Sequence, residues 1–262
     1  MTFEVKDGCY RYPGTKRQVL NHINLTIRSG KVLAVLGSNG VGKTTLLRCM
    51  MGLLKWDGGA SFLDGTPLRI IPSRELWKKI AYVPQAKTSV FSYTAKDMVM
   101  LGRSAHLKMF EQPGEKDVDR ALACMEAVGI SDLQDKRCNE MSGGELQMVL
   151  IARALTTESS MLVLDEPESN LDFRNQLIVL DCIEKLAHSR GISAVINTHY
   201  PEHALQISDQ ALILNRDGTS LYGESGDVIC EEHLRRAFSV RVCIRSVSVG
   251  SGEYRCVIPL SV

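Results

Sequence analysis

The chain has 262 residues, of which 44% are hydrophobic and 23% charged, a composition that fits one large α/β domain with a buried core. Its formal net charge is +1, so the protein has no strong electrostatic field that would favour binding of nucleic acid or of a cationic partner. The eight cysteines form no C-x-x-C pair, which argues against a zinc site or disulfide framework and favours a reducing compartment. No signal peptide is recognisable at the start, and no apolar run approaches the ~20 residues that cross a bilayer.

The first part of the chain predicts short strands and one helix. Alternating apolar residues predict strands at 3–12 and 19–27, and a Pro13-Gly14 turn falls between them. The run at 32–36 is apolar throughout, as expected for a strand buried on both faces. Helical spacing follows at 43–54, and further strands are predicted at 60–63 and 80–83.

The middle of the chain has a different character. Strand signals vanish between residues 86 and 139, and Pro113-Gly114 separates two stretches with helical spacing. We expect this segment to be a helical insertion. Beyond it, helices are predicted at 143–155, 172–189 and 201–207, and strands at 161–164, 193–198 and 211–214. Such alternation predicts a mainly parallel sheet with helices on its faces. Weaker strand patterns follow at 240–247 and 254–258.

A glycine-rich segment joins the buried strand at 32–36 to the next helix. It reads Gly37-Ser38-Asn39-Gly40-Val41-Gly42-Lys43-Thr44, which fits G-x-x-x-x-G-K-[ST] in the strand-to-helix context that this motif requires. The glycines let backbone N–H groups approach the phosphates of a nucleotide, and the helix N-terminus favours their charge. Lys43 is predicted to contact the β- and γ-phosphates and Thr44 to bind Mg²⁺.

Two acidic residues, Asp165 and Glu166, directly follow the apolar run at 161–164. Asp165 would hold Mg²⁺ through water at the carboxyl end of a buried strand, and Glu166 could polarise an attacking water as a general base. Two acids at a strand end can equally well face solvent, and it is the phosphate-binding motif upstream that favours the catalytic interpretation.

Ser142-Gly143-Gly144-Glu145 opens an apolar-periodic helix. The pattern S-x-x-E is a capping box, which satisfies free N–H groups at a helix start. Two glycines in one turn are poor helix formers, so an exposed backbone that meets an anion is the alternative. The residues alone leave both interpretations open.

These segments, in this order, resemble the ATPases of the ABC (ATP-binding cassette) family from about residue 3 to 225. The glycine-rich segment resembles the Walker A motif, residues 161–166 resemble Walker B with its catalytic Glu, and residues 141–145 resemble the L-S-G-G-Q signature with Met for Leu and Glu for Gln. The resemblance implies an α/β, RecA-like P-loop NTPase core with a mainly parallel sheet, an N-terminal antiparallel β subdomain and an inserted helical subdomain. The implied parts are a core of 1–85 and 140–225, a helical subdomain of 86–139 and a C-terminal extension of 226–262.

Other positions gain roles only through this resemblance. Gln85 resembles the Q-loop glutamine, which implies a catalytic and metal-binding role, and His199 resembles the switch histidine that contacts the γ-phosphate. Residues 169–172 resemble the D-loop, with Asn170 where Ala is common. Tyr12 resembles the aromatic residue that stacks on adenine, with Tyr10 as a nearby competitor. The implied nucleotide-binding residues are Tyr12, Ser38, Asn39, Gly40, Val41, Gly42, Lys43, Thr44, Thr45, Ser142, Gly143, Gly144 and Glu145.

The resemblance also implies cofactors and partners. Two copies of the chain would sandwich two ATP molecules with Mg²⁺, head to tail, so that each phosphate site faces the partner's Ser142 segment. Glu145 would bring a carboxylate near that nucleotide, which is unfavourable unless it points into the helix cap. Hydrolysis would open the sandwich and move transmembrane permease subunits, with this chain peripheral on the cytoplasmic face of the cell membrane. An extracytoplasmic solute-binding protein is implied, and nucleic acid is not.

Residues 92–103 resemble those of importers of iron-siderophores, haem, cobalamin and similar metal chelates, although the same stretch also fits a generic helix capped by Thr94. The alternatives are an importer of another solute, an exporter, a soluble non-transport ABC ATPase and a non-catalytic nucleotide sensor. The sensor would be expected to lack Glu166 or His199, and both are present.

One competing motif also occurs. Residues 199–203 fit the zinc-protease pattern H-x-x-E-H, but Pro201 suits the first turn of a helix, so His199 and His203 should diverge. We therefore expect His203 to be a surface residue rather than a metal ligand.

Overall fold

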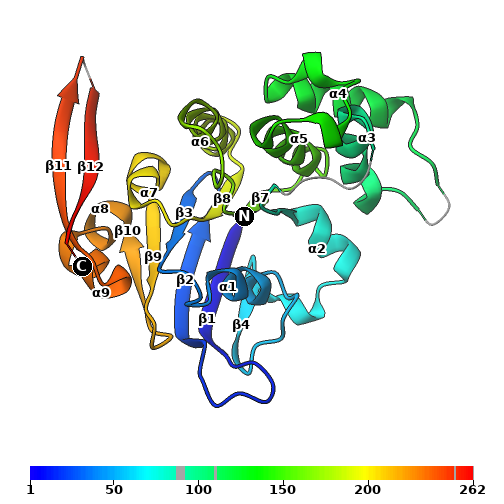
Figure 1. The fold of residues 1–262 in the computed structure, drawn as a ribbon. Helices are drawn as coiled ribbons and strands as arrows, with labels where there is room; N and C mark the ends of the chain where they lie inside the picture. The colour runs from blue at the N-terminus through cyan, green and yellow to red at the C-terminus, as the bar shows by residue number, and fades with distance from the viewer. Residues whose placement is uncertain (87–91, 109–110, 251, 262) are drawn as a thin grey trace. The chain divides into compact units, whose positions relative to one another are not determined.

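The computed structural model describes residues 1–86, 92–108, 111–250 and 252–261. Figure 1 shows its elements, which fall into two compact units, Met1–Ile70 with Ser193–Val262 and Ile71–Ile192. The strands are β1 (Thr2–Tyr10), β2 (Leu20–Arg28), β3 (Val32–Leu36), β4 (Gly58–Leu63), β5 (Thr66–Pro67), β6 (Ile80–Val83), β7 (Met161–Asp165), β8 (Ser193–Asn197), β9 (Gln210–Leu214), β10 (Ser220–Glu224), β11 (Arg241–Val249) and β12 (Gly252–Ser261). The α-helices are α1 (Lys43–Met50), α2 (Ser73–Lys79), α3 (Ala95–Met100), α4 (Glu115–Ala127), α5 (Gly143–Leu155), α6 (Phe173–His188), α7 (Pro201–Ile207), α8 (Ser225–Val228) and α9 (Glu231–Phe238).

The first unit contains an antiparallel sheet in the order β2-β1-β4-β5. Its pairing follows the alternation in the sequence, because Phe3 lies opposite Ile27 and Val5 opposite Leu25. All four of these side chains are buried, so one face of the sheet contributes to the core. This is the antiparallel β subdomain expected at the N-terminus.

The same unit holds the strands that carry the glycine-rich loop, in the order β10-β9-β3-β8. Strand β3 lies between β9 and β8 and is parallel to both, and all five of its residues are buried. Parallel strands end at one common edge, so the loop after β3 and the residues after β8 lie at the same edge. Strand β10 runs antiparallel to β9.

The second unit combines a parallel strand pair with helices. Strands β6 and β7 pair in parallel, with Val83 opposite Leu164. Helices α3 and α4 pack against one another and against α5, which buries ten of its thirteen residues. A helix buried on most of its surface needs neighbours on several sides. The mainly parallel core with an inserted helical subdomain is thus confirmed. Residues 87–91 and 109–110, which belong to the predicted insertion, lie outside the described residues.

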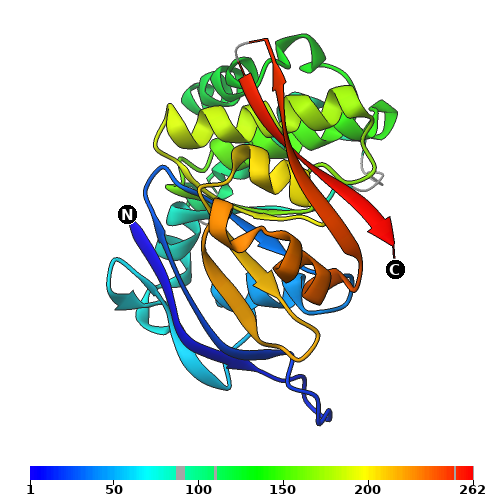
Figure 2. The same ribbon diagram turned by 90° about the vertical axis from the view of Figure 1, so that its left-hand side faces the viewer.

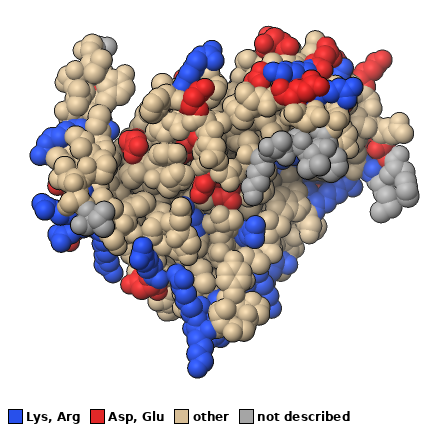
Figure 3. All heavy atoms as spheres, viewed as in Figure 1, with Lys and Arg blue, Asp and Glu red and all other residues tan. Residues whose placement is uncertain are grey.

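The chain ends in a hairpin of β11 and β12, which Figures 1 and 2 show as a long two-stranded ribbon. Strand β12 packs on α7 and strand β11 on α9. The strand patterns predicted at 240–247 and 254–258 are therefore confirmed, and both strands are longer than predicted. On the face drawn in Figure 3, basic and acidic side chains are interspersed.

Several element boundaries differ from the prediction. Helix α1 ends at Met50 rather than at residue 54, because Gly52 takes a left-handed conformation with φ 75°. Helices α2, α8 and α9 and strand β10 were not predicted, since each has only four to eight residues, too few to establish a period. Within the parts of the chain that the structure describes, none of the helices has the length and apolar character of a membrane span.

Candidate active site

The loop between β3 and α1 folds around its own lysine. Lys43 is only 5% exposed, and its Nζ donates hydrogen bonds to the carbonyl oxygens of Gly37 (2.8 Å) and Ser38 (3.4 Å). At Gly37, φ is +147° and a Cβ would lie 2.7 Å from the carbonyl oxygen of Leu214, so a larger residue cannot occupy this position. At Gly40, a Cβ would meet nothing within 4 Å, so the loop is open on that side.

The loop's polar groups fit a phosphate. The Oγ of Ser38 is buried and, within the described residues, makes no hydrogen bond, which is costly unless a ligand supplies a partner. Helix α1 begins after Gly42, which has no side chain, so the helix start lacks a side-chain cap. Asn39 is exposed and Val41 buried. An anion placed at this helix start would satisfy the hydroxyl and the uncapped amides together.

The two candidate stacking tyrosines differ in exposure. Tyr12 is 39% exposed, whereas Tyr10 is only 6% exposed, and their rings meet edge-on with centroids 5.1 Å apart. The hydroxyl of Tyr12 bonds to Oγ1 of Thr45 at 2.8 Å, which fixes the ring beside the first turn of α1. Tyr12 is therefore the residue whose ring is available to a ligand, and Thr45 acts as its anchor.

His199 lies near the glycine-rich loop within the first unit. The backbone N–H of Thr198 donates to the carbonyl oxygen of Val35 at 3.1 Å, so His199 and Gly37 leave neighbouring strands at one edge. The ring of Tyr200 lies between the rings of His199 and His203, with centroid separations of 4.2 and 4.8 Å. His203 is half-buried and thus only partly exposed at the surface. Among the described residues no His, Cys, Asp and Glu group suits a metal ion.

The second unit brings Gln85, Asp165 and Glu166 together. Asp165 is 9% exposed, and its Oδ2 accepts a hydrogen bond from the Tyr82 hydroxyl at 3.1 Å. One carboxylate oxygen of Glu166, Oε2, accepts from Nε2 of Gln85 at 3.4 Å and from the Ser169 hydroxyl at 3.0 Å. Glu166 itself has φ 50°, an unfavourable backbone conformation for a non-glycine residue that is often retained at functional sites.

The start of α5 is a capping box. The Ser142 Oγ accepts from the N–H of Glu145 at 3.3 Å, and Oε2 of Glu145 accepts from the N–H of Ser142 at 2.7 Å. Lys136 Nζ lies 2.7 and 2.9 Å from the two carboxylate oxygens of Glu145. The bond from Lys136, followed by that from the Ser142 N–H, holds the pKa of Glu145 below its ordinary value. The carboxylate thus points into the helix cap, the condition under which it is tolerated beside an anion.

The two glycines of this turn have different surroundings. Gly143 is exposed, and a Cβ there would lie 3.3 Å from Cδ2 of Leu171. Gly144 is buried, and a Cβ there would lie 2.5 Å from Cγ of Asn175 on α6. Close packing against α6 therefore explains Gly144, whereas Gly143 leaves backbone open at the helix start.

Two supporting residues were given no role in the sequence analysis. Tyr82 contacts Asp165, and Gln147 accepts a hydrogen bond from the N–H of Ala86, next to Gln85, at 3.1 Å. Ser169, which contacts Glu166, lies in the segment that resembles the D-loop. Gln147 is only 1% exposed. A buried glutamine in an apolar helix was the one signal that could have drawn attention to it.

A family model, that of the ABC transporters, matches residues 20–169. This chain belongs to the ABC transporter ATP-binding family. As a member of that family it is an ABC ATPase, an ATP-binding and ATP-hydrolysing cassette, and its fold is confirmed as that of the family.

Relatives of this ABC ATPase match it along most of its length. An uncharacterized ABC transporter ATP-binding protein of Haemophilus influenzae is 35% identical and covers 91% of this chain and 89% of its own. A probable iron chelatin transport ATP-binding protein of Helicobacter pylori is 33% identical, with coverages of 82% and 86%. A molybdate import ATP-binding protein of Haemophilus influenzae is also 33% identical, with coverages of 84% and 81%.

A solved structure matches nearly the whole ABC ATPase chain. It is described as an inward-facing conformation of a metal-chelate type ABC transporter, and it is 29% identical with a TM-score of 0.89. The match covers 99% of this chain and 97% of that chain, so it includes the C-terminal hairpin.

Proposed function

We propose that this ABC ATPase powers a membrane importer of metal chelates. The observation that carries this proposal is the structural match over 99% of the chain, at a TM-score of 0.89, to a transporter described as metal-chelate type. The relative named for iron chelatin transport supports the same class of cargo. Iron-siderophores, haem and cobalamin are the members of this class that we expect.

The proposed nucleotide site uses the glycine-rich loop, Asp165, Gln85 and Tyr12. Backbone N–H groups of 38–44 and the orphaned Ser38 hydroxyl hold the phosphates, and Lys43 exchanges its carbonyl partners for the β- and γ-phosphates. Mg²⁺, when bound by Thr44, Asp165 and Gln85, neutralises phosphate charge. These ligands are hard oxygen donors, as Mg²⁺ prefers. Tyr12 stacks on adenine.

The proposed chemistry is general-base catalysis by Glu166. Its Oε2 is fixed by Gln85 and Ser169, and the carboxylate would accept a proton from an attacking water. His199 contacts the γ-phosphate and reports whether that group is present. The bonds to Oε2 orient the carboxylate before substrate arrives, so little reorganisation is needed during the reaction.

Two copies of the chain are proposed to complete each site. In the head-to-tail dimer, the Ser142 hydroxyl and the open backbone at Gly143 meet the partner's γ-phosphate. Because Glu145 is bound within its own helix cap and paired with Lys136, its charge is partly compensated. Loss of the γ-phosphate removes the group that joins the two copies, so hydrolysis opens the dimer.

The second unit has an apolar groove that suits a permease segment. It has a volume of about 310 Å³ and is lined chiefly by Trp77, Leu101, Ala105 and the aliphatic residues of β6. Leu101 is 45% exposed, an apolar side chain that a partner would cover. We propose that transmembrane permease subunits dock here, with the ATPase peripheral on the cytoplasmic face of the membrane. An extracytoplasmic solute-binding protein would deliver the cargo.

A second candidate cargo has its own support. The relative named for molybdate import is as similar to this chain as the one named for iron chelatin transport. Molybdate is a small oxyanion rather than a chelate, so competition between the two cargoes distinguishes the proposals.

The test is reconstitution in proteoliposomes with the permease that co-purifies with this chain and a solute-binding protein from the same organism. We expect ATP-dependent uptake of a ferric siderophore, haem or cobalamin that a Glu166→Gln ATPase does not support, and no competition by molybdate. Uptake of molybdate alone would establish the second candidate. Export of solute, or failure of the ATPase to bind the permease, would refute the importer.

A further inference from the structure

Gln147 lies in the middle of α5, between residues 146 and 148, which are also buried. It is only 1% exposed, and its Oε1 accepts a hydrogen bond from the backbone N–H of Ala86 at 3.1 Å. Helix α5 begins with the Ser142 segment, and Ala86 directly follows Gln85, the proposed metal ligand. The Gln147 side chain therefore connects α5 to the loop that carries Gln85.

Stability does not explain a glutamine at this position. Its Nε2 is buried and makes no hydrogen bond within the residues that the structure describes. A buried amide donor without a partner costs at least as much free energy as one neutral hydrogen bond contributes. A methionine would fill the same space among the apolar residues of α5 without that cost. The amide of Gln147 is explained if holding Ala86 serves the reaction.

The bond to Ala86 fixes more than one atom. The C=O of Gln85 and the N–H of Ala86 belong to one planar peptide unit, so holding that N–H sets the backbone orientation from which the Gln85 side chain projects. The Nε2 of Gln85 donates to Oε2 of Glu166 at 3.4 Å. Gln147 is thus connected to the proposed general base through two hydrogen bonds, with Gln85 between them.

The segment that carries Gln85 has few other attachments. Strand β6 ends before it, and residue 84 is a proline, which has no N–H to donate. Among the residues that the structure describes, 84–86 make no hydrogen bonds other than those to Gln147 and Glu166. Without the bond to Gln147, the backbone at Ala86 could turn, and the Gln85 side chain would turn with it.

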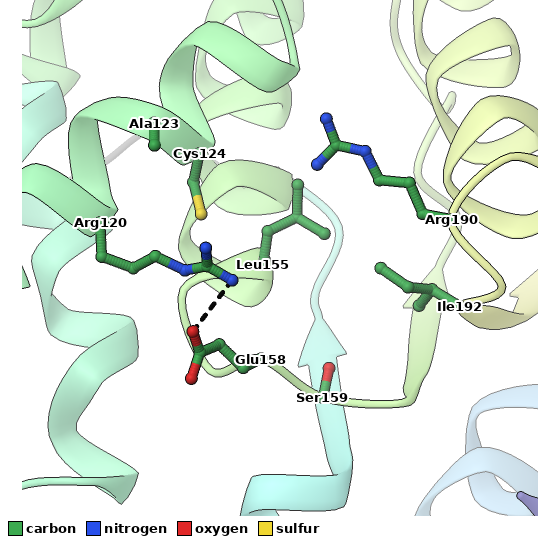
Figure 4. A pocket seen from close by; sticks show the side chains of 8 residues that line it. All are labelled: Arg120, Ala123, Cys124, Leu155, Glu158, Ser159, Arg190 and Ile192. Atoms are coloured by element: carbon green, nitrogen blue, oxygen red, sulfur yellow. Dashed lines mark ion pairs between the residues drawn. The ribbon is translucent and has the colours of Figure 1, made fainter.

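Helix α5 is a firm support for Gln147 because both of its ends are held. At its start, the capping box between Ser142 and Glu145 fixes the first turn. Just after its end, Glu158 pairs with Arg120 of α4 at 3.0 Å, as the dashed line in Figure 4 marks. The position of Gln147 therefore follows that of α5 and α4 together.

We propose that Gln147 is a positioning residue for ATP hydrolysis: by holding the N–H of Ala86 it orients Gln85, and Gln85 in turn orients Glu166. The inference rests on the roles proposed above for Gln85 and Glu166. It connects the helix start proposed to meet the partner's γ-phosphate with the general base through contacts within the second unit. Gln147 itself contacts neither the nucleotide nor the metal.

The first measurement tests the contact itself. Gln147→Met keeps the size of the side chain but removes the acceptor, and hydrogen exchange of the Ala86 amide is followed by backbone NMR on the full chain. Exchange should be about 10-fold faster in the variant, the scale of one hydrogen bond. The melting temperature should stay within about 2 °C of the parent's, because the unsatisfied Nε2 is removed as well. Gln134→Met, a half-buried glutamine in the same unit, is the matched control and should change neither quantity.

The second measurement is steady-state hydrolysis of ATP by the full chain. Gln147→Met should lower kcat about 3–10-fold and raise the Mg²⁺ concentration that gives the half-maximal rate, because Gln85 is proposed to bind the metal. The Kd for ATP in the absence of Mg²⁺ should not change, since residues 38–44 hold the phosphates. A residue that only stabilised the fold would not alter the Mg²⁺ dependence well below the melting temperature.

A double-mutant cycle shows whether Gln147 acts through Gln85. Gln85→Ala should slow hydrolysis, and adding Gln147→Met should slow it no further, because both substitutions disturb the same arrangement. Multiplicative losses would overturn the inference. Hydrolysis at the parental rate by Gln85→Ala would refute the proposed role of Gln85 and the inference with it. If Gln85→Ala is slow, then parental kinetics, unchanged exchange at Ala86 or a clearly lower melting temperature in Gln147→Met would overturn the inference alone.

Discussion

Glu145 offers the sharpest test of the helix start that carries the signature motif. The carboxylate accepts the Ser142 N–H at 2.7 Å and pairs with Lys136 at 2.7 Å. Glu145→Gln keeps an oxygen for the cap but removes the ion pair, whereas Glu145→Ala removes both. We therefore expect the alanine variant to be clearly less stable than the glutamine variant.

The magnitudes follow from the two contacts. A partly exposed ion pair contributes about 0.5 kcal/mol, and a charged hydrogen bond to a backbone N–H about 1.5 kcal/mol. At roughly 2–4 °C per kcal/mol for a chain of this size, Glu145→Gln should lower Tm by about 1–2 °C and Glu145→Ala by about 4–8 °C. Lys136→Met should lower Tm as much as Glu145→Gln does. The double variant should lower Tm little more than either single substitution, because both remove the same ion pair.

The pH dependence has a definite sign. Because the folded pKa of Glu145 is lowered, its contribution is complete above the unfolded pKa of about 4.3 and is lost as pH falls through the lower folded value. Tm of the parent and of Glu145→Gln, followed by circular dichroism, should therefore differ at pH 7 and converge below about pH 4, because the protonated carboxyl, like the amide, keeps only a neutral oxygen for the cap. Equal losses for the Gln and Ala variants, or a difference that persists in acid, would refute this account of the cap.

The other predictions concern catalysis and packing. Glu166→Gln should bind ATP but hydrolyse it about 10²–10⁴-fold more slowly and accumulate as an ATP-bound dimer in size-exclusion chromatography; unchanged hydrolysis would remove Glu166 from the role of base. Ser142→Arg should block hydrolysis while ATP binding to the monomer stays intact, and a monomer that hydrolyses ATP at the full rate would contradict the two-chain site. Gly144→Ala should destabilise the chain by about 1–3 kcal/mol because its Cβ would lie 2.5 Å from Asn175. Gly143→Ala should change the free energy of unfolding by about 0.5 kcal/mol or less. Equal urea midpoints for the two variants would show that Asn175 moves aside at little energetic cost and would contradict this account of Gly144.

Contiguous motifs were the most predictable part of the molecule. The loop at 37–44 could be located because its residue types are required by local backbone geometry, such as the positive φ of Gly37 and Gly40. The strands β3, β7 and β8 were equally clear, since each contains a run of three to five consecutive apolar residues, as expected for a strand buried on both faces.

Contacts between distant residues could not be predicted. Nothing near Asp165 indicates that Tyr82 will donate to it, because that contact depends on the register of β6 against β7. The sequence likewise presented Gly143 and Gly144 as equivalent, and only the approach of Asn175 distinguishes them. Short elements such as α2, whose only fully buried residue is Leu76, carry too little periodicity to be recognised.

The most direct test of the central claim is a structure of the Glu166→Gln chain with Mg²⁺ and ATP. We predict that the triphosphate lies against the amides of residues 38–44, with the Ser38 hydroxyl and Lys43 on its oxygens and Mg²⁺ between Thr44 and Asp165. A triphosphate bound elsewhere, or a metal ion that Asp165 does not approach directly or through water, would contradict the proposed site.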